Sequence, residues 1–124
     1  ENPPYYPKDE QLTDRSERFF VSEIIREKIL QNYTKEIPYS VEVNVEEFKE
    51  SEEIIRIRTI IYVERPTQKG ILIGHKGQSL KKTGTQARID IEKFFGKKVY
   101  LETFVKVDKN WRNRPEKLKH FGYH

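Results

Sequence analysis

The chain has 124 residues, a length that predicts one domain, and its composition of 35% hydrophobic and 35% charged residues allows only a small core. It contains no cysteine, which excludes disulfides and cysteine-ligated metals, and it has neither an apolar run of transmembrane length nor a signal-peptide pattern. Residues 1–64 carry 9 Lys/Arg and 15 Asp/Glu (net −6), whereas residues 65–124 carry 15 and 5 (net +10), so the second half either suits a polyanionic partner or is an ordinary solvated surface.

The first segment, residues 1–13, contains three prolines and no periodic pattern, and it is interpreted as an extended lead-in. Since methionine is absent even from position 1, we expect the chain to be a piece of a longer protein. A helix is predicted to begin at the capping pair Asp14 and Glu17. Its buried face is expected to consist of apolar residues at three- and four-residue spacing, namely Phe20, Val21, Ile24, Ile25, Ile29 and Tyr33.

Two strands are predicted next. Val41, Val43 and Val45 alternate with polar residues, which is typical of a half-buried strand. A polar turn over residues 49–53 leads to a second strand, and the two are expected to form an antiparallel hairpin. The buried face of the second strand is predicted to hold Ile55, Ile57, Ile61 and Val63.

The second half of the chain is predicted to hold a helix that ends at Gly96 and a third strand over residues 99–107. The packed side of that helix is expected to hold Leu80, Gly84, Ala87, Ile91 and either Phe94 or Phe95. A short C-terminal helix, with Asn113 and Glu116 in capping positions, is predicted to dock through Leu118 and Phe121. The order α-β-β-α-α-β plus an extension indicates an α+β domain, with a three-stranded sheet and helices packed on one face.

The stretch "QKGILIGHKGQ", residues 68–78, interrupts an apolar run with closely spaced glycines. Glycine permits positive φ and close approach of another backbone, and the helix expected after Gly77 offers unpaired N–H groups that suit a phosphate. Neither common nucleotide loop fits, because Gln78 stands where the Walker pattern needs lysine and the glycine spacing is wrong for a dinucleotide fingerprint. The loop is therefore predicted to hold backbone phosphates, beside an apolar wall that takes bases.

The candidate site residues fall into three groups. The loop itself is formed by Gly74, His75, Lys76 and Gly77. Of Ile71 and Ile73, one is expected in the core and the other in the groove. The remaining candidates, which are either phosphate contacts or ordinary surface charges, are Lys69, Lys81, Arg65 and Arg88. Tyr62, Tyr100 and Phe104 would stack on bases or pack against the chain ends.

An aliphatic-Gly-x-x-Gly motif in a basic loop, within this order of elements, resembles KH domains, whose loop clamps about four nucleotides of single-stranded nucleic acid. The first helix before the hairpin and the strand at the end resemble the bacterial, type II arrangement. Two longer stretches, "YYPKDEQLTDRSERFFVSEIIREKIL" and "VERPTQKGILIGHKGQSLKKTGTQARIDIEKFFGKKVYLETFVKVDKNWR", are similar to the C-terminal region of the Era family of bacterial GTPases. Together they cover nearly the whole chain.

The resemblance implies a type II KH domain over residues 14–109, preceded by a lead-in (1–13) from an absent GTPase domain and followed by an extension (110–124). It implies single-stranded RNA binding at the 3′ end of 16S rRNA during assembly of the 30S subunit, in the cytoplasm and with peripheral contact to the inner face of its membrane. GTP and magnesium would belong to the absent domain, and this chain is expected to hold no cofactor, metal or catalytic residue. The alternatives are a KH module for a different RNA and a protein-interaction domain that uses the sheet face or the acidic hairpin.

Overall fold

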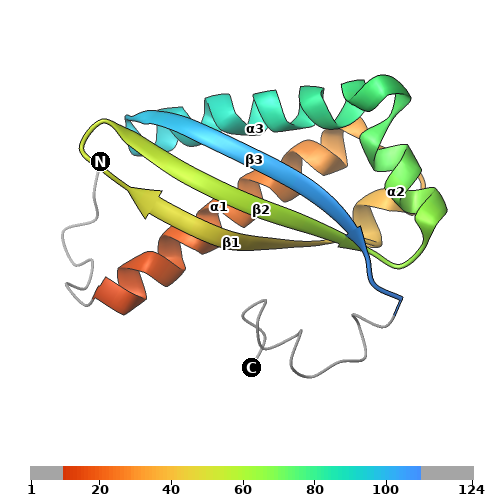
Figure 1. Ribbon diagram of the computed structural model, residues 1–124, viewed down its shortest axis with the longest axis horizontal. Helices are drawn as coiled ribbons and strands as arrows, with labels where there is room; N and C mark the ends of the chain where they lie inside the picture. Colours follow the sequence, from red (N-terminus) through yellow and green to blue (C-terminus); the bar gives the residue numbers. More distant parts are fainter. Residues whose placement is uncertain (1–9, 110–124) are drawn as a thin grey trace.

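The computed structural model describes residues 10–109, with side chains from residue 15 onward, and its regular elements follow the predicted order (Figure 1). The first half holds helix α1 (Glu10–Asn32), a short 3-10 helix (Ile37–Tyr39) and strands β1 (Glu42–Glu50) and β2 (Ile54–Val63). The second half holds α2 (Pro66–Ile73), a second 3-10 turn (His75–Gly77), α3 (Gln78–Phe95) and β3 (Lys98–Val107). The predicted C-terminal helix lies outside the described residues.

The three strands form one mixed sheet in the order β1-β2-β3. β1 and β2 pair antiparallel, as the hairpin prediction required, and a bulge interrupts their register between Val45 and Glu47. β2 and β3 pair parallel, from Ile54 opposite Lys98 to Val63 opposite Val107. A parallel pair needs a crossover, and α2 and α3 provide it.

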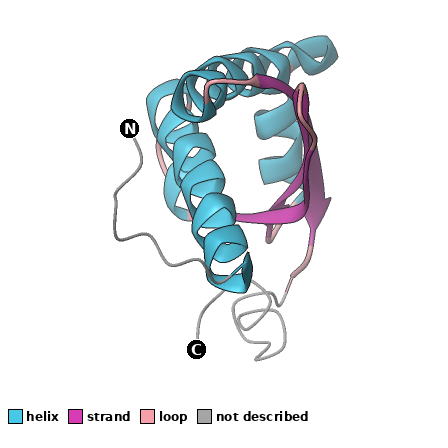
Figure 2. Cartoon of the chain, turned by 90° about the vertical axis from the view of Figure 1, so that its left-hand side faces the viewer, coloured by secondary structure: helices cyan, strands magenta, loops and turns pink. Residues whose placement is uncertain are grey.

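Helices α1 and α3 cover one face of the sheet, so the core lies between the two layers (Figures 1 and 2). The predicted apolar stripe of the second strand is confirmed, because Ile55, Ile57, Ile61 and Val63 are all buried. α3 adds Ala87 and Ile91, and a Cβ added at Gly84 would lie 3.6 Å from the Thr103 hydroxyl on β3. The core-facing residues of α1 are Val21, Ile25, Ile29 and Tyr33.

Four boundary or burial predictions were wrong. β1 was predicted to be half-buried, but Glu42 and Asn44, which alternate with its valines, are buried as well. α1 begins at Glu10 rather than at the capping pair that starts with Asp14, since no proline or glycine separates Pro7 from Asp14. The hairpin turn is shorter than residues 49–53, because β1 runs to Glu50 and the Ser51 N–H bonds to the Ile54 carbonyl at 2.9 Å. Phe20 was predicted to be buried but is 37% exposed, at the flank of the stripe.

The end of α3 is as predicted. Gly96 caps the helix with φ of +70°, and its N–H bonds to the Glu92 carbonyl. At the end of the helix, Phe95 packs against the core while Phe94 is 52% exposed, which resolves the alternative left open by the sequence. Among residues 10–109, no helix is long and apolar enough to cross a membrane.

Candidate nucleic-acid interface

The predicted loop lies between α2 and α3, and α2 is fixed firmly at its start. Arg65 is its N-cap residue, with an extended backbone, and Pro66 occupies the first turn, where a missing N–H costs nothing. The buried Gln68 side chain accepts hydrogen bonds from the backbone N–H of Arg65 at 2.9 Å and of Glu64 at 3.0 Å. This cap fixes the orientation of α2, and with it the position of the residues that lead into the loop.

Gly74 ends α2 in a conformation that only glycine adopts readily, with φ of +77° and ψ of −178°. Its N–H still bonds to the Gly70 carbonyl at 2.9 Å. A Cβ at this position would lie 2.6 Å from the Ser79 Cβ and 3.1 Å from the Ser79 backbone nitrogen. The chain therefore reverses here only because the residue has no side chain, and the first turn of α3 is held tightly against the end of α2.

Two further loop residues, Lys76 and Gly77, adopt left-handed backbone conformations. Lys76 has φ of +53°, and Gly77 has φ of +75° with open space where a Cβ would stand. The Gly77 N–H bonds to the Gly74 carbonyl at 3.1 Å, which closes the turn. The result is a compact loop whose outer surface at Gly77 is bare backbone.

The start of α3 is open and positively charged. Gly77 is its N-cap residue and no side chain caps the helix, so the positive end of the helix dipole faces outward. His75 and Lys76 are exposed in the loop, and Lys81 and Lys82 are exposed in the first turns of α3. A phosphate diester fits such a site, because backbone N–H groups, a dipole and ammonium groups all favour an anion.

Asn32, the last residue of α1, and Tyr33, which follows it, support the loop through contacts that no sequence pattern indicated. The buried Tyr33 hydroxyl donates to the Leu72 carbonyl at 2.6 Å, near the end of α2. The Asn32 amide nitrogen donates to the side chains of Thr83 at 3.0 Å and Gln86 at 2.8 Å, both on α3. Burial raises the pKa of Tyr33, so its hydroxyl stays a donor over the neutral range.

The two isoleucines take different places. Ile73 is partly buried and packs against the core, whereas Ile71 is 53% exposed on the side of α2 that faces the segment after α1. Leu72 between them is fully buried. Ile73 is thus the isoleucine of the pair that packs against the core, and Ile71 borders the surface toward the segment after α1.

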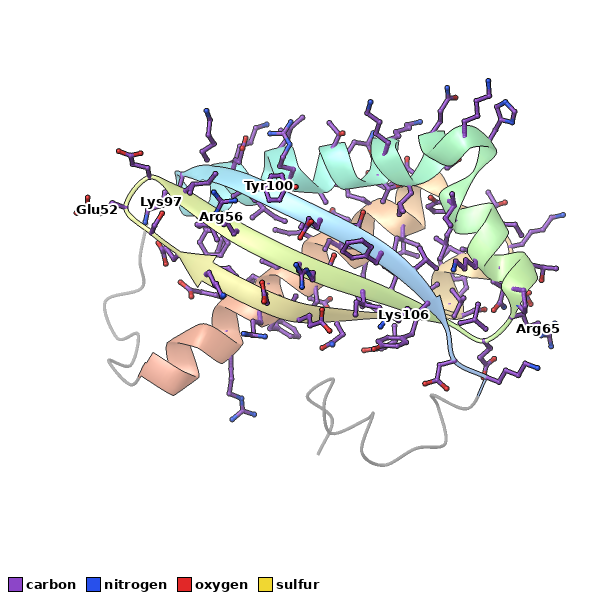
Figure 3. The ribbon with its side chains drawn as sticks, in the orientation of Figure 1. Glu52, Arg56, Arg65, Lys97, Tyr100 and Lys106 are labelled. Atoms are coloured by element: carbon purple, nitrogen blue, oxygen red, sulfur yellow. The ribbon has the colours of Figure 1, made fainter. Side chains whose placement is uncertain are left out.

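The predicted basic candidates are not equally available. Arg65 is exposed at the start of α2 (Figure 3), and Lys69 is half-buried on the same helix. Arg88 donates to the Glu92 carboxylate at 3.1 Å, within α3. Glu92 also accepts the Val99 N–H at 3.0 Å, and these contacts, the backbone one foremost, lower the pKa of its carboxyl. Arg88 is therefore tied to the junction of α3 and β3 and lies one to two helical turns beyond the exposed Lys81 and Lys82.

The three aromatic candidates also separate. Tyr62 is only 8% exposed and forms a small buried cluster with Ile60, so it is not a stacking surface. Tyr100 and Phe104 are 50% and 45% exposed on β3. Arg56 from the neighbouring strand lies over the Tyr100 ring, 5.8 Å from its centroid (Figure 3).

Within the part of the chain that is described, no three His, Cys, Asp or Glu side chains are placed to hold a metal ion. What the loop offers is an anion site on a rigid support, within an α-β-β-α-α-β fold that has a mixed three-stranded sheet. This combination of fold and two-glycine turn defines a KH domain.

The family model for the KH domain matches residues 36–112. The chain belongs to the KH domain family.

Individual relatives narrow the comparison. The chain is 54% identical over 125 positions to GTPase Era of Syntrophus aciditrophicus and 53% identical over 124 positions to GTPase Era of Staphylococcus epidermidis, covering 99% of this chain in both cases. It covers only 40% and 41% of those proteins, so the chain spans about two fifths of the length of the curated relatives it matches.

Solved structures agree with the sequence relatives. A crystal structure of an Aquifex aeolicus Era variant bound to GDP.AlF4- superimposes with a TM-score of 0.80 at 37% identity, over 99% of this chain and 42% of that one. A structure of Era in complex with MgGDPNP and nucleotides 1506–1542 of 16S ribosomal RNA also gives a TM-score of 0.80, at 38% identity, over 99% of this chain and 41% of that one.

Proposed function

We propose that this chain binds single-stranded RNA by clamping its sugar-phosphate backbone at residues 74–77. The observation that carries the proposal is the turn itself. Gly74 adopts a conformation restricted to glycine, and Gly77 leaves bare backbone at the uncapped start of α3. A phosphate can approach there to hydrogen-bonding distance of main-chain N–H groups, which no side chain covers.

The surrounding charges support capture of a polyanion. His75, Lys76, Lys81 and Lys82 are exposed next to the turn, and residues 65–124 carry a net charge of +10. Affinity for single-stranded RNA should therefore fall as salt rises, with a slope of roughly −0.7 for each phosphate neutralised. Ile73, which is partly buried and directly precedes the turn, offers bases an apolar surface beside the phosphate track.

The RNA we propose is the 3′ end of 16S rRNA. A structure of Era holds nucleotides 1506–1542 of that RNA, and this chain shares its fold over 99% of its length. We extend the proposal to the whole protein: a GTP-binding domain with magnesium outside this chain, action on the 30S subunit during assembly, and a cytoplasmic location with peripheral membrane contact. The GTP-binding domain follows from the names of the relatives. The assembly, cytoplasmic and membrane assignments rest on the resemblance to the Era family alone, not on a site within residues 10–109.

The test is fluorescence anisotropy with a short labelled RNA that copies the 3′ end of 16S rRNA. The His75→Asp/Lys76→Asp double variant should lose at least tenfold in affinity, because it replaces favourable charge at the clamp with repulsion. Aspartate is among the non-glycine residues that tolerate the left-handed backbone at Lys76, so the fold is retained. Circular dichroism checks this directly.

A matched control separates the loop from charge in general. Lys49 is exposed near the hairpin end of β1, at the opposite end of the sheet from the loop, and Lys49→Asp changes the net charge as much as Lys76→Asp does. Lys76→Asp should weaken binding severalfold more than Lys49→Asp. Equal losses would place the RNA elsewhere, and no binding by the wild-type chain would favour a protein partner for the sheet face or hairpin, or a different RNA.

A further inference from the structure

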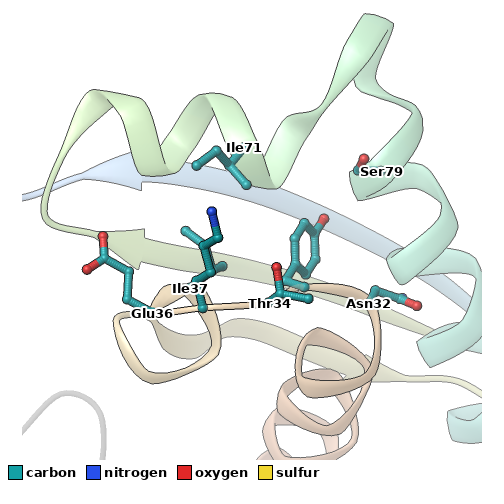
Figure 4. Close-up of a pocket in the computed structure, with 8 residues that line it drawn as sticks. Asn32, Thr34, Glu36, Ile37, Ile71 and Ser79 are labelled. Atoms are coloured by element: carbon teal, nitrogen blue, oxygen red, sulfur yellow. The ribbon is translucent and has the colours of Figure 1, made fainter.

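A cleft of about 550 Å3 opens beside the loop. It lies between the segment that follows α1, the exposed face of α2 and the first turn of α3 (Figure 4). Ile71 projects into it from α2, and Thr34 and Ile37 border it from the opposite side. The role proposed above for the Gly74–Gly77 turn does not use this cleft.

The cleft and the loop share a residue. Ser79 lines the cleft, and it is also the residue against which Gly74 packs so closely that a Cβ there would lie 2.6 Å from the Ser79 Cβ. An RNA strand bound across the backbone of the loop would therefore reach the cleft at Ser79, the second residue of α3. This continuity suits the next nucleotide of the same strand better than an unrelated ligand.

The lining has the chemistry of a nucleotide site. Ile71 is 53% exposed and faces the Tyr33 side of the cleft, which gives an apolar surface for a base. Hydroxyl groups of Thr34 and Ser79 can donate to or accept from a base edge or a ribose. The volume of about 550 Å3 is within the usual range for small-ligand sites.

The two charged residues of the lining, Lys35 and Glu36, favour different parts of a nucleotide. Lys35 is exposed and has φ of +61°; it and Lys76 in the loop are the two non-glycine residues with positive φ among residues 10–109. Such a backbone costs about 1 kcal/mol for a lysine. Lys76 would border the proposed strand at the turn and Lys35 would border it at the cleft. The Glu36 carboxylate, which accepts from the Gln68 amide at 3.4 Å, repels a phosphate but can accept from the amino group of a base.

We infer that this cleft is a subsite for one further RNA nucleotide, adjacent to those held by the loop, with its base against Ile71 and its phosphate at Lys35. The inference rests on the proposed function, and it makes the RNA footprint longer than the loop alone requires.

The experiment compares three labelled RNAs in anisotropy titrations. The short RNA has the four nucleotides that the loop is expected to hold, and two extended RNAs carry two more nucleotides, one at the 5′ end and the other at the 3′ end. One of the extended RNAs should bind the wild-type chain about five- to tenfold more tightly than the short RNA. Lys35→Gly should reduce that gain to about twofold or less and leave the short RNA unaffected.

The variants are chosen so that a lost gain reports on the cleft and not on misfolding. Lys35→Gly removes the ammonium group and also relieves the positive φ, so loss of folding is not an expected outcome. It should also lower the salt slope for the extended RNA by roughly 0.7. Ile71→Ser, at an exposed position, should lose the same gain through the base, while Lys49→Gln at the hairpin end should keep it.

The inference is overturned if both variants retain the extension gain, or if they weaken the short RNA by the same factor. Failure of the wild-type chain to bind either RNA would overturn the proposed function as well. The two failures are thus distinct, because only the second removes binding of the short RNA.

Discussion

Replacing Gly74 by alanine is expected to destabilise the domain by about 3 kcal/mol. The backbone at Gly74, with φ of +77° and ψ of −178°, lies in a region that is essentially restricted to glycine and costs other residues roughly 1–3 kcal/mol. The added Cβ would also lie 2.6 Å from the Ser79 Cβ, and overpacking of this kind costs roughly 1–3 kcal/mol more. Reduced freedom of the unfolded chain offsets about 0.4–1 kcal/mol of the sum.

Two other glycines supply matched controls. Gly77 and Gly96 have φ of +75° and +70°, and a Cβ would meet nothing within 4 Å at either position. Gly77→Ala and Gly96→Ala should therefore cost only the left-handed strain, a net of about 1 kcal/mol each. Their effects on RNA should differ, because Gly77 lies in the loop and Gly96 ends α3. Only Gly77→Ala should weaken RNA binding.

The assay is urea unfolding followed by circular dichroism, with the denaturant slope compared between variants to confirm that only stability has changed. The reasoning also predicts a partial rescue. In Gly74→Ala/Ser79→Gly, the contact with the Ser79 side chain is removed, so the double variant should recover about 1 kcal/mol relative to the sum of the single effects. If Gly74→Ala were as stable as Gly77→Ala, the close packing of the two helices at the loop would be refuted.

Three further changes test the supports of the loop and the sheet. Tyr33→Phe should cost about 1–2 kcal/mol in urea unfolding, because the Leu72 carbonyl loses its buried donor; an unchanged midpoint would contradict that bond. Asp90→Asn should cost about 0.5–1 kcal/mol at neutral pH, since Lys28 contacts Asp90 at 2.6 Å on a partly exposed surface. That hydrogen bond raises the pKa of Lys28, so the advantage of the wild type is complete below the unfolded lysine pKa of about 10.4 and should be lost as pH rises through the higher folded value. The pH dependence is opposite for Glu92, whose pKa is lowered by a backbone N–H of β3. The stability advantage of the wild type over Glu92→Gln should therefore be lost as pH falls below the unfolded pKa of about 4.3 and through the lower folded pKa. A pH-independent difference in stability would refute this.

Much of the fold follows from local patterns. Alternating valines and isoleucines identified β1 and β2 because each strand has one face on the core, and Val43, Ile55 and Ile57 are indeed buried. Gly96 identified the end of α3, since a left-handed cap favours glycine. The start of α1 was misplaced because a capping pair inside a helix has the same letters as one at its end.

The loop was predicted for a similar reason, whereas its surroundings were not. Two glycines three residues apart indicate positions that need a positive φ, and this can be recognised from the sequence alone. The partners of Tyr33 and Asn32 depend on where three helices meet, over separations of 39 to 54 residues. No periodicity encodes such contacts. The choice between Ile71 and Ile73 depended likewise on the rotation of α2, which its cap at Gln68 determines.

These contacts make the end of α1 a common support for both sides of the proposed RNA site. Tyr33 holds the last turn of α2 and Asn32 holds α3, so the two arms of the Gly74–Gly77 turn are attached to one short segment. The same segment continues into Lys35, at the cleft proposed for a further nucleotide. Tyr33→Phe should therefore weaken binding of the short RNA as well as stability, whereas Lys35→Gly should affect the extended RNA alone. If Tyr33→Phe left binding of the short RNA unchanged while Lys35→Gly weakened it, the segment after α1 would not position the loop in this way.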